Sequence, residues 1–512
     1  MIYQECAQLE AGVTFFILGV GEQNIKFFII ASCTDKPAQS LLTNMVSHNA
    51  NYSCAKCFTE GENFTIYSKK VRKSTIKVFP YRNDEVRNNS ICNNLAIEAE
   101  QHGSPVKGHA APCPLTKLKY YSFGESILFD SLHTLYLGVF KKFCSLIFSK
   151  SKTDRQQKWS LYNKINSIDQ GLSSVKIPTT TSRRFRTIKH IARFKANEFR
   201  SLMHHGSTVL LQAMLPKYRR HFALLLAAVN IASKDIIGNY DIILVKELLH
   251  QYVKDWQKIF GLRHMSSNIH SLLHIHESIQ FLGPLYMYSA FNFEGIGHDL
   301  VCMIHGMTHY GPQLISNLQY YRQAIIDVFK LDYPEKLLYF NESILSRKLV
   351  SNQGIHVRKR VSFTNYVDEM KHLNLITKRK FLYHDELAIK HVKYKTLSST
   401  KSRKFADCCV SFVFGRQIKL GLIRAIVSDP NDNGKILILL EDLIDEFARH
   451  HLLQFKTNNT TFSTIPNIYI RKRSSCLILR SSSHILQKHS FRFLNNEETI
   501  EIIEYSNLKE SS

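Results

Sequence analysis

The sequence predicts an α+β protein of several domains, because three of its segments follow different patterns. Strand-like runs occupy residues 12 to 32, apolar residues recur three and four apart from residue 121 to 330, and apolar and polar residues alternate in residues 405 to 512. At 512 residues with 44% hydrophobic content, the chain can bury two or three cores. We therefore expect an amino-terminal sheet, a large helical region and a small carboxyl-terminal β-barrel or sandwich.

The amino-terminal segment is predicted to be a sheet that ends at an acidic residue. Thr14 to Leu18 and Ile25 to Ile30 are rich in β-branched and aromatic residues and are separated by a Gly-containing turn. Both runs are almost entirely apolar, which favours strands covered on two faces. Asp35 follows the second run, and Pro37 marks a helix start. The Asp35 carboxylate is thus expected at the carboxyl end of a buried strand, where sites in α/β sheets commonly lie.

The remaining segments differ in composition. Residues 58 to 120 are rich in Asn, Ser, Lys and Gly and show little apolar periodicity, which indicates an irregular connection. Residues 121 to 330 predict a helical domain. The basic and weakly patterned residues 331 to 404 indicate a linker, and the turn-forming run DPNDNG in the last segment is typical of a β-rich domain.

Charge and cysteine content limit the cellular setting. A net charge of +25 favours a polyanionic partner, most often nucleic acid, and the alternative is a merely basic, solvated surface. Eleven cysteines are too sparse and irregular for a disulfide framework. The start MIYQECAQLE does not read as a secretory leader, and no apolar run reaches about 18 residues. We expect an intracellular protein with reduced thiols and no membrane segment.

A pair of cysteines has the spacing of half a zinc site. Cys54 and Cys57 are separated by two residues, which lets both sulfurs reach one tetrahedral metal at about 2.3 Å. Two ordinary buried thiols are the alternative. The missing ligands must come from elsewhere, and the available candidates are His48, His109, Cys113 and His133.

Two histidine patterns could contribute to such a site. Asp130 and His133 are three residues apart and would share a helix face, so the carboxylate can orient the imidazole or both can approach one metal. A helix cap beside a solvent-facing histidine is the alternative. His270 and His274 are four apart and could bind zinc, but the Glu of a His-Glu-x-x-His metalloprotease motif is missing, and core or surface histidines are commoner.

An acidic residue near position 300 is a second candidate for cation binding. Glu294 follows Phe291 and Phe293, which would place its carboxylate at the edge of a core. Burial there is costly unless a cation compensates for the charge. An exposed glutamate at a helix start, favoured by the helix dipole, is the alternative.

A basic stretch, TSRRFRTIKHIARFKANEFR, is a candidate for phosphate binding. Its cations are interleaved with phenylalanines, and at this density they can neutralise several phosphates while the rings bury or stack. A solvated basic helix face is the alternative. The cationic residues are Arg183, Arg184, Arg186, Lys189, Arg193, Lys195 and Arg200.

In this order, several segments resemble the transposases of CACTA-type (En/Spm-like) DNA elements, in the variety common in invertebrate genomes. The resemblance covers about residues 12 to 310 and rests on CTDKPAQ, His48 followed by CAKC and GE, GSPV, FDSLHTLYLGVFKK, ARFKANEFR and NIHSLLHIHESIQFLGPLYMYSAFNFE. It implies a partial RNase H-like mixed sheet interrupted by a large helical insertion. It also implies DNA strand cleavage and transfer by a DDE triad of acids that holds two divalent metals, Mg²⁺ or Mn²⁺.

The resemblance assigns roles to individual residues. Asp35 corresponds to the second acid of the triad and Glu294 to the third. Cys54 and Cys57 match the family's Cys-x-x-Cys signature, and Asp130 with His133 matches its Asp-x-x-His signature, so the predicted zinc ligands are Cys54, Cys57, His133, Asp130 and His48.

Two departures from the family suggest weak or absent activity. The family's first Asp lies upstream of the second, yet residues 1 to 34 contain no Asp. After Glu294 the family continues with Asn and a basic run, whereas this chain has GIGHDLVCMIHG. We expect either a chain that begins inside a longer reading frame or a remnant truncated at its amino end.

The resulting prediction is a nuclear, transposase-derived DNA-binding protein, ancestrally a polynucleotidyl transferase of DNA transposition and recombination, with impaired catalysis. A homo-oligomer is compatible with it. The alternatives are a domesticated, non-catalytic scaffold for DNA or proteins and, least favoured, a zinc-dependent hydrolase. The predicted organisation is a partial catalytic core (1–50), an insertion (51–285), a return helix with Glu294 (286–330), a basic linker (331–404) and a β-rich domain (405–512).

Overall fold

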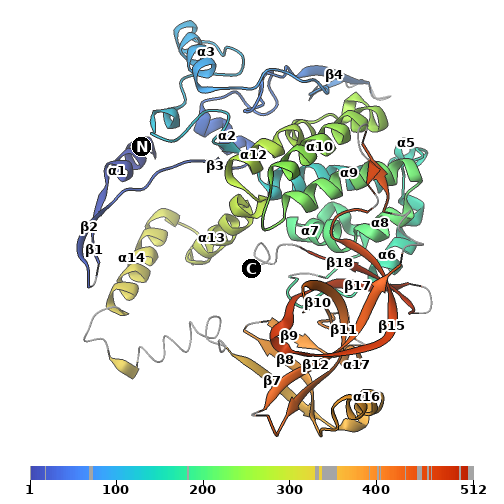
Figure 1. Cartoon of the computed structure of the whole chain (residues 1–512). Coiled ribbons are helices and arrows are strands. Elements are labelled where there is room, and N and C mark those ends of the chain that lie inside the picture. The colour runs from blue at the N-terminus through green and yellow to red at the C-terminus, as the bar shows by residue number, and fades with distance from the viewer. Residues whose placement is uncertain are drawn as a thin grey trace. The chain divides into compact units, whose positions relative to one another are not determined.

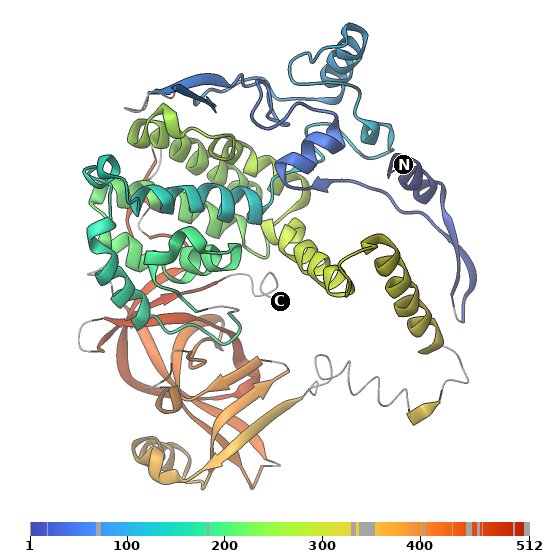
Figure 2. The same ribbon diagram turned by 180° about the vertical axis from the view of Figure 1, so that it is seen from behind.

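The computed structural model divides into two compact units (Figures 1 and 2). The first contains residues 1–169, 186–290 and 451–466, and the second contains 170–185, 291–450 and 467–512. Among the described residues no helix combines the length and apolarity needed to cross a lipid bilayer. The structure describes residues 2–17, 19–67, 73–181, 184–328, 334–336, 354–390, 392–400, 403, 405–432, 434–446, 453–457, 461–462, 464–494 and 497–505.

The amino-terminal strands are less extensive and more exposed than predicted. After α1 (Ile2–Ala11), β1 (Val13–Ile17) pairs antiparallel with β2 (Gly21–Ile25), and the predicted strand continuing to Ile30 is irregular. Among the described residues β1 and β2 pair only with each other, so no further strand shields the apolar side chains. The ring of Phe16 is 74% exposed. The prediction of two buried strands was therefore wrong.

A short parallel pair carries two acidic residues at its carboxyl end. Ser32 and Cys33 form β3, which pairs with β6 (Ile127–Leu128) in the register Ser32↔Ile127 and Cys33↔Leu128. Asp35 and Asp130 each lie two residues beyond the last paired residue of their strand, so they occupy equivalent positions. Each is also the N-cap of the helix that follows, α2 (Lys36–Thr43) or the π-helical η2 (Ser131–Phe140). The helix start predicted at Asp35 and Pro37 is confirmed.

Residues 58 to 120 contain more regular structure than predicted. β4 (Glu62–Tyr67) and β5 (Lys73–Val78) form an antiparallel pair, and α3 spans Asn89–His102. The side chain of Asn88 accepts a hydrogen bond from the Ile91 N–H at 3.0 Å, and the C-cap Gly103 adopts φ +62°. Capping therefore supports a helix whose apolar periodicity is weak.

The predicted helical region is confirmed. Its core is aromatic: the rings of Phe143 and Phe222 stack 5.0 Å apart, and Trp256 packs against Phe143. Figure 1 shows α9 and α10 side by side within this region. Its α-helices are α4 (Lys141–Ile147), α5 (Lys152–Arg155), α6 (Ile165–Ser174), α7 (Ala196–His205), α8 (Ser207–Ala213), α9 (Pro216–Ala232), α10 (Asn239–Phe260), α11 (Ser267–Ser271), α12 (Ile275–Leu282), α13 (Ala290–Cys302) and α14 (Tyr310–Val328). The 3₁₀ elements η3 (Tyr162–Lys164), η4 (Ile188–Arg193), η5 (Leu262–His264), η6 (Leu272–His274) and η7 (Leu285–Tyr288) lie between them, and η1 (Pro114–Lys117) precedes the region.

The second unit is built on a ten-stranded antiparallel sheet. Seven strands follow the order β16-β10-β11-β12-β15-β18-β17, and β8 pairs with β11, β7 and β9. The strands are β7 (Ile355–Val361), β8 (Leu382–Ile389), β9 (Val392–Lys395), β10 (Cys409–Phe414), β11 (Gln417–Asp429), β12 (Lys435–Asp445), β15 (Ile468–Ser481), β16 (Ile485–Lys488), β17 (Ser490–Leu494) and β18 (Thr499–Ile503). The β-rich carboxyl-terminal prediction is thus confirmed as a large antiparallel sheet.

Both faces of the central strand β11 are buried. Ile426 belongs to one core, and Val427 packs on the other face with Leu373 of α16 (Val367–Thr377). This burial on two faces explains why β11 carries so many apolar residues in succession.

The predicted basic linker is largely part of this sheet. β8 pairs directly with β11, with His384 opposite Ile426, so residues 354–390 cannot be a linker. Lysines and arginines interrupt the alternation of β7, which hid the strand from the sequence pattern. Residues 337–353 of that predicted linker lie outside the described residues.

Candidate metal centre

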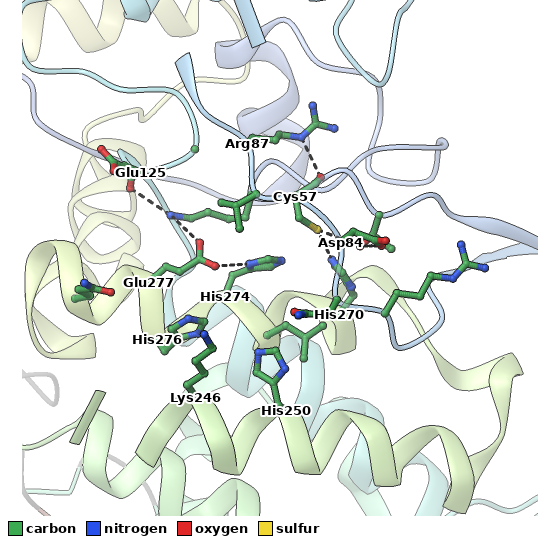
Figure 3. Close-up of a pocket in the computed structure, with 18 of the residues that line it drawn as sticks. Cys57, Asp84, Arg87, Glu125, Lys246, His250, His270, His274, His276 and Glu277 are labelled. Atoms are coloured by element: carbon green, nitrogen blue, oxygen red, sulfur yellow. Dashed lines mark hydrogen bonds and ion pairs between the residues drawn. The ribbon is translucent and has the colours of Figure 1, made fainter. Parts of the chain in front are cut away.

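Four buried side chains converge in the first unit. The ligand atoms of Cys54, Cys57, His270 and His274 all lie within 4.8 Å of one another. Each of the four residues is at most 6% exposed. Figure 3 shows Cys57 and His270 directed toward each other, and the distance from Cys57 Sγ to His270 Nε2 is 3.2 Å. The cluster can hold a metal ion.

The cysteine loop is held by a buried arginine. Arg87 Nε donates hydrogen bonds to the carbonyl oxygens of Cys54, at 2.7 Å, and Cys57, at 3.0 Å. The same guanidinium donates to the carbonyls of Tyr52 and Lys107. Backbone pairing of Cys57 with Val86 adds a second support. These contacts fix both ends of the Cys-x-x-Cys turn, so the two sulfurs face the same space.

The two histidines come from one helical segment. His270 lies in α11 and His274 ends η6, which continues into α12. Residues four apart on a helix lie on the same face, so both imidazoles reach the cysteine loop. The backbone N–H of Phe79, at the end of the β4–β5 pair, donates to the Met265 carbonyl at 2.8 Å and fixes this segment against the hairpin.

A carboxylate orients one of the imidazoles. His274 Nδ1 lies 2.8 Å from Glu277 Oε1, and Figure 3 shows the Glu277 carboxylate directed toward the His274 ring. Lys56 Nζ is 4.0 Å from the second oxygen of Glu277. His274 Nε2 is buried without a hydrogen-bond partner among the described residues. A carboxylate on one ring nitrogen with the other nitrogen left open is the usual arrangement of a metal-bound histidine.

The electrostatics favour a thiolate at Cys54. Burial alone would raise its pKa, but the hydrogen bond with Cys57 and the charges of His274 and His270 lower the pKa well below the usual value. The pKa of Cys57 is raised, chiefly by its hydrogen bond with Cys54 and by burial. The two sulfurs therefore share one negative charge in the absence of a metal. A divalent cation would stabilise the second thiolate as well.

Two lysines, the buried Lys56 and the half-buried Lys36, border the cluster. Burial lowers the pKa of Lys36 and of Lys56 to about 8, and the Cys54 thiolate acts in the opposite direction on both groups. Lys36 donates to the Ser271 hydroxyl at 2.8 Å, and Lys56 donates to the Glu125 carbonyl at 3.2 Å. These ammonium groups partly compensate for the buried thiolate charge.

A cavity of about 560 Å³ adjoins the cluster. Three of the four cluster residues, Cys57, His270 and His274, contribute to its wall. Figure 3 shows His250 and Lys246 of α10 and His276 of α12 on another side of the same cavity. Burial lowers the pKa of both His250 and His276 to about 4, so these imidazoles are neutral near pH 7. The cavity gives a metal ion a route to the cluster.

The structure brings only part of the predicted zinc set together. Cys54 and Cys57 are in the cluster, whereas His48 contributes a backbone carbonyl to the Ser53 hydroxyl. The Asp130 carboxylate accepts from the His133 N–H and lies 3.1 Å from His133 Nδ1. Asp130 therefore caps the helix and also contacts the His133 imidazole, and neither residue belongs to the cluster.

The two other proposed ligands have different roles. His109 Nε2 lies 2.7 Å from the Arg87 guanidinium, so this histidine supports the arginine that holds the cysteine loop. Cys113 belongs to an apolar core with Tyr121 and Phe123. The sequence pattern alone favours core or surface histidines at His270 and His274, whereas the structure places both in the cluster. The signal that could have identified it was the combination of a four-residue histidine spacing with a separate Cys-x-x-Cys pair.

The two predicted catalytic acids belong to different compact units. Asp35 is in the first unit, where it accepts from the Ala38 N–H at 2.8 Å, and Glu294 is in the second. Glu294 is exposed on α13, and neighbouring Phe293 is 63% exposed, so the expected position at the edge of a core is not found. Neither acid belongs to a metal-binding group among the described residues. Their convergence stays a prediction.

The cations of the predicted phosphate-binding stretch differ in exposure and in their partners. Lys189, Arg193 and Lys195 are exposed, whereas Arg200 is buried in α7. Arg186 pairs with Glu198 at 3.1 Å, and Arg184 lies over the Phe405 ring at 4.5 Å. Arg183 lies outside the described residues. The stretch therefore offers fewer free cations than its composition indicates.

No family model, curated protein or solved structure matches the chain.

Proposed function

We propose that this chain is a zinc-stabilised, nucleic-acid-binding protein of the transposase type, with impaired or absent strand cleavage. The cluster of two cysteines and two histidines is the observation that carries the proposal. Two thiolates and two neutral imidazoles suit tetrahedral Zn²⁺, and they also balance its charge. Four protein ligands leave no position for a reacting water, so the metal has a structural role and a zinc hydrolase is disfavoured.

The position of this centre in the chain supports the same conclusion. His270 and Cys57 are 213 residues apart in sequence. A metal joining them closes a long loop, and most of the free energy of binding becomes free energy of folding. In the resemblance to transposases, the Cys-x-x-Cys pair and the histidine pair both lie in the insertion (51–285) between the second and third acids. A zinc ion would tie the beginning of that insertion to its end.

Nucleic-acid binding is supported by charge. The net charge is +25, and phosphate neutralisation by lysine and arginine releases counterions and makes affinity fall steeply with salt. The rival candidate is a protein-binding scaffold. We expect log affinity for DNA to fall linearly with log salt concentration, and a nearly flat dependence would favour the scaffold.

The parallel strands β3 and β6 support a link to the transposase catalytic core. Asp35 and Asp130 follow equivalent paired positions, at the edge where parallel sheets commonly hold sites. In the resemblance Asp35 is the second acid and Glu294 the third, and the first acid has no counterpart in residues 1 to 34. With residues 1 to 34 lacking an Asp, we expect purified protein not to nick plasmid DNA in Mg²⁺ or Mn²⁺. Nicking that Asp35→Ala abolishes would contradict this part of the proposal.

Metal analysis tests the central claim. We expect about one zinc per chain, since the cluster contains the four ligands of a single tetrahedral site. The Cys54→Ser, Cys57→Ser variant should lose it. The matched control, Cys302→Ser with Cys476→Ser, changes two exposed thiols and should retain the metal. Full zinc in the first variant would exclude these cysteines from the site.

A further inference from the structure

A second cavity, separate from the metal centre, lies among the helices of the first unit. Its volume is about 820 Å³, which is within the roughly 300–1,000 Å³ range of small-molecule sites. Four parts of the chain form it: α4 and the residues after it, η3 with the start of α6, η4, and α7. Three lysines and three aromatic residues belong to its wall.

The charge of this cavity has one sign. Lys141, Lys150 and Lys189 belong to its wall, and no carboxylate does. Within the described residues none of these three ammonium groups forms an ion pair, and all three side chains are exposed. The cavity therefore presents unneutralised positive charge to a ligand.

Nearby carboxylates are already engaged elsewhere. Asp154 accepts from the Ser149 hydroxyl at 2.6 Å. Asp169 accepts from the Ile188 backbone N–H at 2.8 Å. The carboxylates of Asp154 and Asp169 are thus hydrogen-bonded to other groups and do not form ion pairs with the three lysines. An anionic ligand would thus complete the charge balance.

The rest of the wall suits a flat, partly apolar group. Phe148 and Phe199 are buried, and the half-buried ring of Tyr162 adds aromatic surface. The guanidinium of Arg155 lies 3.7 Å from the centroid of the Tyr162 ring, which restrains that ring. Asn163 and Asn166 provide amide donors and acceptors three residues apart.

We propose that this cavity binds a nucleotide unit, with its phosphate at the lysines and its base against the aromatic and apolar wall. Lysines beside an aromatic surface are the usual elements of single-strand recognition, in which cations follow the phosphates and bases stack. Lys189 belongs to the basic stretch recognised in the sequence, and exposed Arg193 follows it on η4. This proposal rests on, and deepens, the proposed nucleic-acid binding.

The test compares two charge-matched triple variants. One carries Lys141→Gln, Lys150→Gln and Lys189→Gln, and the control carries Lys217→Gln, Lys254→Gln and Lys258→Gln, which are exposed lysines of α9 and α10 outside the cavity. The probes are a thymidine oligonucleotide, the matching duplex and thymidine monophosphate. For the oligonucleotide we expect the cavity variant to lose affinity at least tenfold and its salt slope to become shallower by about 2, at about 0.7 per phosphate contact. The control should change much less.

A second pair of variants tests the aromatic wall. We expect Tyr162→Ala to weaken oligonucleotide binding about tenfold and Tyr162→Phe to retain it, because stacking requires the ring and not the hydroxyl. Equal losses in the two lysine triples, or full binding by Tyr162→Ala, would overturn the assignment of the cavity.

The probes separate the possible failures. If DNA binds with unchanged affinity to the cavity variant, the cavity proposal fails while the nucleic-acid function stands. A second outcome is that neither the wild type nor any variant binds DNA, while thymidine monophosphate binds the wild type and not the cavity variant. The ligand is then a free nucleotide. In that case the cavity proposal stands and the proposed function fails. If no probe depends on the cavity lysines, the cavity proposal fails.

Discussion

At the scale of single residues, Arg87 explains why the cysteine loop has its shape. Burying a guanidinium is costly unless its donors are satisfied, and here they reach four carbonyl oxygens and His109. The side chain is 2% exposed. The loop needs this residue because the backbone carbonyls of Cys54 and Cys57 accept no hydrogen bond from a helix or a sheet among the described residues. Arg87 supplies the missing donor. Local sequence gives no sign of this role, since the arginine is 30 residues from Cys57.

Glu277 should control metal affinity through His274. We expect Glu277→Gln to weaken zinc binding about 10- to 100-fold, because the imidazole loses the carboxylate that orients it and increases its basicity. Chelator competition measures the change. The control is Glu125→Gln, since the exposed Glu125 accepts the hydrogen bond from Lys56 through its backbone carbonyl, which the substitution leaves in place. Unchanged affinity in Glu277→Gln would show that His274 does not bind the metal through Nε2.

At the scale of helices and strands, the sequence predicts an element correctly when interactions within that element determine its structure. The amphipathic helices of the middle region are such a case, and so is the Asp35 cap of α2, since its hydrogen bond is local. The exposed β1–β2 pair is the opposite case. Apolar runs predict burial only when another element covers them, and the identity of that element is a tertiary property.

The candidate site shows the same limit. The Cys-x-x-Cys spacing is local and identified half of the cluster. The histidines belong to a helix that is brought close by the β4–β5 pair, and neither strand of that pair has a strong pattern. Burial of His270 and His274 could therefore not be derived from their own segment. Asp130 and His133 were predicted as ligands because their spacing is compatible with a metal, but helix capping uses the same spacing.

The contact between α9 and α10 should make stability depend on pH. His221 stacks on Tyr252 with ring centroids 4.2 Å apart, and its Nε2 lies 3.1 Å from the Tyr252 carbonyl. Burial lowers the pKa of His221 to about 4. As the pH falls, the imidazole is protonated in the unfolded chain at a higher pH than in the folded protein. The stability that the neutral His221 contributes is therefore lost as pH falls from about 6.5 toward 4.

The variant His221→Phe measures this contribution. From pH 7 to pH 5 the wild type should lose about 2 kcal/mol of unfolding free energy through this group, and the variant should lose correspondingly less. Urea denaturation at the two pH values gives both numbers. The phenylalanine keeps the aromatic stack but removes the titrating nitrogen. An equal loss in the two proteins would assign the acid sensitivity to other buried histidines, such as His205, whose pKa burial lowers to about 3.

At the scale of the whole molecule, the metal and the large sheet belong to different units. All four cluster residues lie in the first unit, and the ten-stranded sheet lies in the second. The second unit has its own apolar cores on the two faces of β11. It also contains a buried ion pair between Lys488 and Asp407, which are 2.7 Å apart. The stability of the second unit is therefore expected to be independent of zinc.

Zinc removal should thus act on one unit only. A ligand that binds the folded state stabilises it by RT ln(1 + [L]/Kd), about 4 kcal/mol at a thousandfold excess over Kd, so a chelator should remove several kcal/mol from the first unit. Hydrogen exchange locates the effect: amides of β4, β5 and the segment from α11 to α12 should exchange faster, while those of β11 and β12 should not change. The variant Cys54→Ser, Cys57→Ser should show the same pattern without chelator. Faster exchange throughout β11 and β12 would instead mean that the two units unfold together, and no change in β4 and β5 would mean that the metal does not connect the cysteine loop to the histidine helix.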